Sequence, residues 1–94
     1  MTNASAIGTF LAAPIDPPPE VLDAARLCFA DWLGCAVGAE AEDAGRIVRA
    51  TVAGWNAGGR CSVLYGRPTS APFAALANGT LAHCLDFDDT YVAA

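Results

Sequence analysis

The longest amphipathic segment of the chain spans residues 19–37 and reads PEVLDAARLCFADWLGCAV. Its apolar side chains recur every three or four residues, the spacing of one face of an α-helix. Pro19 suits the first turn of a helix, and Gly38 is a suitable stop. We therefore expect a core helix over residues 19–37, with an inward stripe of Val21, Leu22, Ala25, Cys28, Phe29, Trp32, Leu33, Ala36 and Val37.

Upstream of this segment, residues 4–13 predict a short helix with Ile7, Phe10 and Leu11 on one side. Pro14 ends it. The residues that follow, 15–19, contain three consecutive prolines, which disfavour helix before them and indicate a stiff, extended connector.

Downstream, residues 42–57 predict a second amphipathic helix that Gly58 and Gly59 terminate. Its pattern places Arg46 and Arg49 outward. The side chains expected inward are Ile47, Val48, Thr51, Val52 and Trp55. Residues 61–66 are β-prone and closed by a Gly-Arg-Pro turn, so we expect one short extended segment or turn there, and not a full sheet.

A further helix is expected over residues 70–84, with Ser70 at its N-cap and Pro72 in its first turn. The pair Asn78-Gly79 interrupts its apolar run. Glycine is costly inside a helix, so the pair indicates either a break or a close approach of another backbone or a ligand. The predicted fold class is thus mainly α, within one domain at most.

The composition is unusually apolar for a soluble domain. Hydrophobic residues make up 54% and charged residues 16%, whereas about 25% charged is ordinary. Such an excess of apolar surface is typical of a piece of a larger core or of an obligate interface.

Charge and hydropathy exclude several functions. The net charge is -5, lysine is absent and the five arginines are scattered, which argues against nucleic acid because phosphates require a basic patch. No apolar run reaches the ~18 residues of a membrane span. The first ten residues do not resemble a secretory signal, so we expect a cytoplasmic protein.

The four cysteines, Cys28, Cys35, Cys61 and Cys84, contain no C-x-x-C pair. Iron-sulfur and zinc sites require tighter ligand spacing than this. We therefore expect reduced, buried thiols that act as small apolar side chains, and no metal.

Reactive groups concentrate near the end of the chain, in residues 77–90. His83 is followed by Asp86, Asp88, Asp89 and the hydroxyl of Thr90. Clustered carboxylates suit a hard-cation site, acid–base catalysis, or a plain role as helix caps and solvated groups. An EF-hand loop is disfavoured, because Tyr91 stands where that loop needs glycine.

Two residues outside this tail each have a structural and a functional interpretation. Asp31 lies next to the apolar stripe of residues 19–37, and an exposed or locally bonded carboxylate is favoured over a catalytic one. Arg67 could bind a substrate carboxylate bidentately, but a solvated or structural arginine is favoured.

The tail closely resembles the signature segment of the MmgE/PrpD family, which includes 2-methylcitrate dehydratases and cis-aconitate decarboxylases. The matching residues are Asn78-Gly79, His83 and Asp86-Phe87-Asp88-Asp89-Thr90. Two earlier segments also look like the family in order and spacing, namely Asp31-Trp32-Leu33-Gly34 and Ser62-Val63-Leu64-Tyr65-Gly66.

The resemblance implies that residues 1–94 are the N-terminal part of the family's helical domain. Family members are several times longer and add a smaller lid domain, a His-Pro element and later lysines, none of which is present. The chain thus looks like a fragment that lacks the lid domain. By the same resemblance, the parent protein is expected to form homodimers.

For function, the resemblance implies a cofactor-independent lyase that acts on a small di- or tricarboxylate. Asp86 and Thr90 match active-site positions of the family, so Asp86 is expected to transfer a proton or hold a catalytic partner, and Thr90 to bond a substrate carboxylate. His83 either orients Asp86 or packs, and Asp88 and Asp89 support the structure. The alternatives are a catalytically inactive helical interaction protein and a divalent-cation-binding module.

Overall fold

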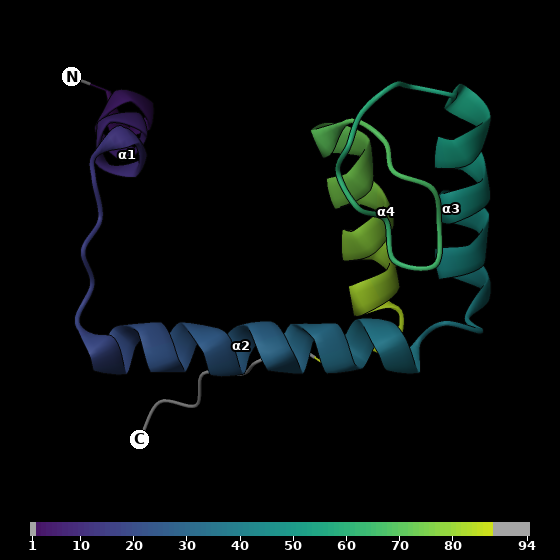
Figure 1. Cartoon of the computed structure of the whole chain (residues 1–94), viewed down its shortest axis with the longest axis horizontal. Coiled ribbons are helices and arrows are strands. Elements are labelled where there is room, and N and C mark those ends of the chain that lie inside the picture. Colours follow the sequence, from purple (N-terminus) through teal and green to yellow (C-terminus); the bar gives the residue numbers. More distant parts are fainter. Residues whose placement is uncertain (1, 88–94) are drawn as a thin grey trace.

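A computed structural model of the chain describes residues 2–87, and within them the chain forms four helices (Figure 1). In chain order they are α1 (Asn3–Ala12), α2 (Pro19–Gly38), α3 (Asp43–Trp55) and α4 (Ala71–His83). The predicted class, mainly α, is confirmed. Each predicted helix occurs with bounds within two residues of those expected. Asp88, Asp89 and Thr90 lie outside the described residues.

Helix α4 is the element that holds α2 and α3 together. It packs against both α2 and α3, whereas α1 makes no helix–helix contact within the described residues. In Figure 1, α3 and α4 stand side by side over the C-terminal part of α2, and α1 lies apart near the other end. The fold that positions any site is therefore the α2–α3–α4 part.

The helix ends have local causes. At the start of α1, the Thr2 hydroxyl accepts a hydrogen bond from the Ser5 backbone N–H at 3.1 Å, which caps the helix. The same helix ends before Ala13, whose extended backbone is the conformation that Pro14 favours in its neighbour. Helix α3 stops earlier than the expected Gly58-Gly59, because Asn56 takes the left-handed conformation at φ 49°.

The core consists of two small clusters, both built on α4. Ala74 and Ala77 of α4 pack with Val52 of α3 and with Val63 of the connecting loop. On the other side, Leu81 packs with Ala36 and Ala39 at the end of α2. Small residues dominate both clusters, so the helices approach closely and little apolar area is buried.

The prediction of a core helix over residues 19–37 is wrong for most of α2. Ala36 is its one buried residue, while Val21, Leu22, Phe29 and Val37 are exposed. The physical reason is that α4 crosses α2 near its C-terminal end, and no other described helix contacts α2. The expected excess of apolar surface is present here.

Helix α3 follows its predicted pattern only in part. Val52 is buried and Val48 packs beside it, as expected. However, Ile47, Thr51 and Trp55 are exposed. Trp55 instead lies against Phe73, with ring centroids 4.9 Å apart.

Two alternatives were predicted for Asn78-Gly79, a break or a close approach of another backbone or a ligand. The break does not occur, because α4 is continuous from Ala71 to His83. The Asn78 side chain has a different role: its oxygen accepts from the Leu64 N–H and its nitrogen donates to the Ser62 carbonyl, each at 2.9 Å. Asn78 thus ties the 61–69 loop to α4. The same loop closes through a single antiparallel β-bridge between Cys61 and Thr69, which agrees with the predicted extended segment.

The cysteines are unpaired but not buried. Cys28 and Cys61 are exposed, and Cys35 and Cys84 are partly exposed, so the prediction of buried thiols is wrong. No helix formed by residues 2–87 combines the length and hydropathy required to cross a membrane.

Candidate functional site

A cavity of about 240 Å³ lies between α2 and α4, beside the start of the acidic tail. Four residues of α2 and three of α4 line it, together with one residue after α4. They are Cys28, Asp31, Trp32, Cys35, Gly79, Ala82, His83 and Phe87. Residues 77–90 were predicted to hold the chemistry, and part of that stretch borders this cavity.

Helical spacing accounts for the α2 wall of the cavity. Cys28, Asp31, Trp32 and Cys35 are three, one and three residues apart, so they share one face of the helix. Phe29 stacks near Trp32, with ring centroids 5.6 Å apart, and this contact restricts the indole. Asp31 therefore lies within a regular helix, which fixes the position of its backbone.

The α4 wall depends on Gly79. Apart from the adjacent residues and the backbone of α4 itself, no described atom lies within 4 Å of the position that a Cβ would occupy there, so the absent side chain leaves open space one helical turn before His83. This finding gives the Asn78-Gly79 pair a physical meaning other than a break. Asn78 forms hydrogen bonds with the neighbouring loop, and Gly79, which has no side chain, leaves room for the cavity beside α4.

His83 is the last residue of α4, and its side chain borders the cavity together with Asp31. The two residues come from segments about 50 positions apart, and α4 crossing α2 brings them to one site. A histidine and a carboxylate that face one cavity can together move a proton and orient a polar substrate.

Asp86 follows His83 after a tight turn. Its backbone N–H donates to the His83 carbonyl at 2.9 Å, and its φ of 56° lies in the left-handed region. Aspartate tolerates this conformation better than most residues. The turn couples the backbone of Asp86 to the end of α4, and the side chain is exposed and does not line the cavity.

The predicted site residues are thus only partly brought together. His83 reaches the cavity, Asp86 lies three residues further along the chain, and Thr90 lies outside the described residues. Asp31, for which an exposed or locally bonded carboxylate was favoured, is exposed as expected, and it also borders the cavity. Its place there follows from its position one turn from Cys28 and Cys35, on a face that continues toward the end contacted by α4.

No group of three or more His, Cys, Asp or Glu side chains among residues 2–87 is arranged to hold a metal ion. Asp88 and Asp89, which belong to the cation-module alternative, lie beyond that range. Within the described part of the chain, the reactive groups that line this cavity are a histidine, a carboxylate and thiols.

A family model matches most of the chain. No curated protein and no solved structure matches the chain significantly. The model of the MmgE/PrpD N-terminal domain matches residues 9–94, which is nearly the whole chain and includes all three segments that carry the resemblance. The chain therefore belongs to the MmgE/PrpD family, and its sequence is that of the family's N-terminal domain.

Proposed function

We propose that this chain provides part of the active site of a cofactor-independent lyase that acts on a small di- or tricarboxylate. The observation that carries the proposal is the position of His83, a residue of the family signature, at the end of α4 beside a cavity that Asp31 also lines. The substrates that fit best are of the 2-methylcitrate and cis-aconitate type, because the resemblance points to enzymes that act on these acids.

The reaction requires few groups. In a dehydration, a base removes a proton from the carbon next to a carboxylate, a general acid protonates the departing hydroxyl, and a C=C bond forms as water leaves. In a decarboxylation, a C–C bond breaks, carbon dioxide leaves, and an acid returns a proton to the carbon. Both reactions need paired acid and base groups and a polar grip on the substrate carboxylates.

We assign the proton transfer to Asp86, either directly or through a partner that it holds. The Thr90 hydroxyl donates a hydrogen bond to a substrate carboxylate. His83 orients Asp86, which follows it by one turn at the end of α4. Asp31 joins this set because it faces the cavity across from α4, where it can hold the imidazole or the substrate.

A second candidate function is helix-mediated association without catalysis. The exposed apolar side chains of α1 and of the N-terminal part of α2 favour it, because apolar surface of this extent is typical of an interface. In the lyase, the same surface would serve the homodimer. The two functions differ in whether any carboxylate is turned over.

The test uses the polypeptide encoded by the whole reading frame, expressed and purified, with 2-methylcitrate and cis-aconitate as substrates. Proton NMR follows loss of water, and trapped carbon dioxide follows decarboxylation. We expect turnover of one acid and at least a ~100-fold loss in the His83→Gln or Asp31→Asn variant, since positioned acid–base groups contribute about 10²–10⁴-fold. Association of the protein with no turnover of either acid would favour the second candidate and reject the first.

A further inference from the structure

A second cavity, of about 400 Å³, lies on the other side of the fold, between α3 and the 61–69 loop. It shares no lining residue with the cavity beside His83. Its wall from α3 includes Arg46 and Arg49, and its wall from the loop includes Tyr65 and Arg67. We name this cavity the arginine groove.

The charge of the arginine groove is opposite to that of the chain as a whole. Three of the five arginines line it, and no aspartate or glutamate of residues 2–87 does, although the net charge is -5. One of the three, Arg46, is paired with Asp43 at 2.9 Å, but both side chains of that pair are largely exposed. An exposed pair of this kind is weak and exchanges readily for another anion.

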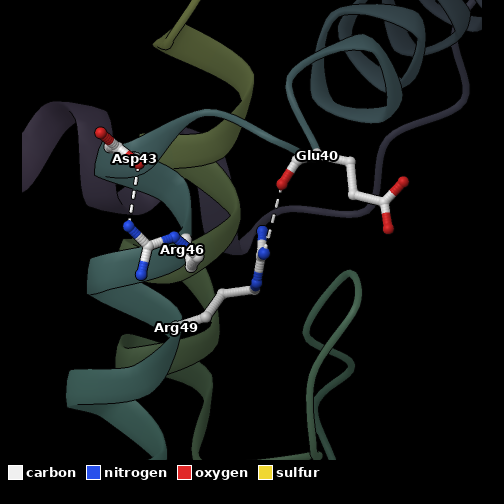
Figure 2. A network of polar contacts seen from close by, with 4 residues as sticks. All are labelled: Glu40, Asp43, Arg46 and Arg49. Carbon is white, nitrogen blue, oxygen red and sulfur yellow. Dashed lines mark hydrogen bonds and ion pairs between the residues drawn. The ribbon is translucent and has the colours of Figure 1, made fainter.

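Arg49 is held in place without a carboxylate partner among residues 2–87. Its guanidinium lies 5.7 Å from the centre of the Tyr65 ring, and its Nη2 donates to the main-chain carbonyl of Glu40 at 3.4 Å. Figure 2 shows that the Glu40 carboxylate points away from this contact, while Arg46 is turned toward Asp43. The charge of Arg49 is therefore not neutralised by the Glu40 carboxylate.

The other nitrogen of Arg49, Nη1, is buried and has no hydrogen-bond partner within the described part of the chain. A buried N–H group of a charged side chain without a partner is costly. Arg49 was predicted to face solvent; it is partly exposed, and Tyr65 of the 61–69 loop lies against its guanidinium. Arg49 therefore brings a positive charge to the wall of the groove, and no carboxylate of residues 2–87 is paired with it.

The loop wall is fixed in an unusual conformation. Tyr65 has a φ of 60°, which is rare for a bulky residue. The hydrogen bonds from Asn78 and the bridge between Cys61 and Thr69 hold the loop on both sides. These contacts place the ring against Arg49 and give the groove a preformed wall.

We propose that the arginine groove binds a small organic anion that carries two or more carboxylates. Guanidinium groups pair bidentately with carboxylates, and a volume of this size lies in the range of about 300–1,000 Å³ typical of small-molecule sites. Val52 and Val63 supply apolar surface in the same cavity, which favours a ligand with a carbon skeleton over inorganic phosphate. The site is separate from the proposed catalytic one, so it does not depend on the proposed function.

The experiment is a calorimetric titration of the 94-residue chain with propane-1,2,3-tricarboxylate, which has no hydroxyl to eliminate. We expect saturable binding that weakens as salt is raised. Arg67→Gln and Arg49→Gln should each weaken binding about 10-fold or more, since each removes a charge-assisted hydrogen bond. Arg67 is exposed, so its variant remains informative if loss of Arg49 perturbs folding, which circular dichroism would reveal.

A matched control defines the site. Arg26→Gln removes the same charge from an exposed ion pair on α2, outside the groove, and should leave the affinity unchanged. The proposal is overturned if no binding occurs or if Arg26→Gln weakens it as much as Arg67→Gln. Equal affinity for inorganic phosphate would overturn the assignment to an organic polycarboxylate.

Discussion

The α3–α4 half of the molecule and the α1–α2 half contain similar apolar helices but differ in what covers them. Leu81 of α4 is 0% exposed, whereas Leu27 of α2 is 73% exposed. Both leucines lie in helices with many apolar residues, and α4 meets two other helices while most of α2 meets none of those described. The difference teaches that helical periodicity identifies an apolar face, while burial depends on which elements reach it.

The largest expected effect is the loss of unfolding free energy when a buried leucine is truncated, compared with the same change at an exposed leucine. Leu81→Ala should lower the free energy of unfolding by about 2–5 kcal/mol, because it leaves a cavity between α4 and the end of α2. Leu27→Ala, the same change at an exposed site, should alter it by less than about 0.5 kcal/mol. Urea denaturation followed by circular dichroism measures both. Equal losses would mean that Leu27 is buried in solution by a contact outside the described helices.

A second test concerns the 61–69 loop, which belongs to the α3–α4 half of the molecule and has no counterpart in the α1–α2 half. At Gly59 an added Cβ would collide with the backbone of Thr69 and Ser70, so Gly59→Ala should cost about 1–3 kcal/mol of unfolding free energy. Gly58 has open space around it, and Gly58→Ala is the matched control. That control should be neutral or stabilising by up to about 1 kcal/mol, because alanine restricts the unfolded chain.

If thermal melts show the same midpoint for both alanine variants, the close approach of Gly59 to residues 69 and 70 does not persist in solution. A lower midpoint for Gly59→Ala alone confirms it.

The smallest of these effects should come from Asn78, the residue that joins the loop to α4. Asn78→Ala removes two hydrogen bonds and leaves the Leu64 N–H and the Ser62 carbonyl unpaired, at a cost of about 1–2 kcal/mol. Asn78→Asp keeps the acceptor for Leu64 and loses the donor to Ser62, so a smaller loss is expected. Hydrogen exchange of the Leu64 amide provides a local readout, and unchanged protection in Asn78→Ala would rule out the tie.

Much of the fold could be predicted from the sequence, because local signals decide where helices begin and end. The apolar period of residues 19–37, the proline at its start and the proline after Ala13 are sufficient for α1 and α2. What could not be predicted is which faces meet. Phe29 and Val52 both belong to amphipathic stripes, and only the crossing of α4 over α3 and over the end of α2 makes one buried and leaves the other exposed.

The residues of the candidate site likewise differ in how far the sequence could predict them. His83 and Asp86 were identified by their chemistry and by resemblance, since reactive groups are scarce elsewhere in the chain. Asp31 and Arg49 were assigned to solvent, and in the structure Asp31 is exposed and Arg49 is partly exposed. Which distant segments lie beside them could not be predicted: α4 borders the same cavity as Asp31, and Tyr65, in a loop that begins a dozen residues after Arg49, lies against its guanidinium.

The central claim is that the end of α4 belongs to the active site of a carboxylate lyase, and Asp86→Asn tests it most directly. Asparagine tolerates the left-handed backbone of Asp86 as well as aspartate does, so the change removes the acid and keeps the turn. Asp23→Asn, at an exposed position on α2, is the control. The measurement is kcat for the preferred acid with the polypeptide of the whole reading frame. We predict a loss of at least ~100-fold for Asp86→Asn with an unchanged melting temperature; a kcat equal to that of Asp23→Asn would contradict the account.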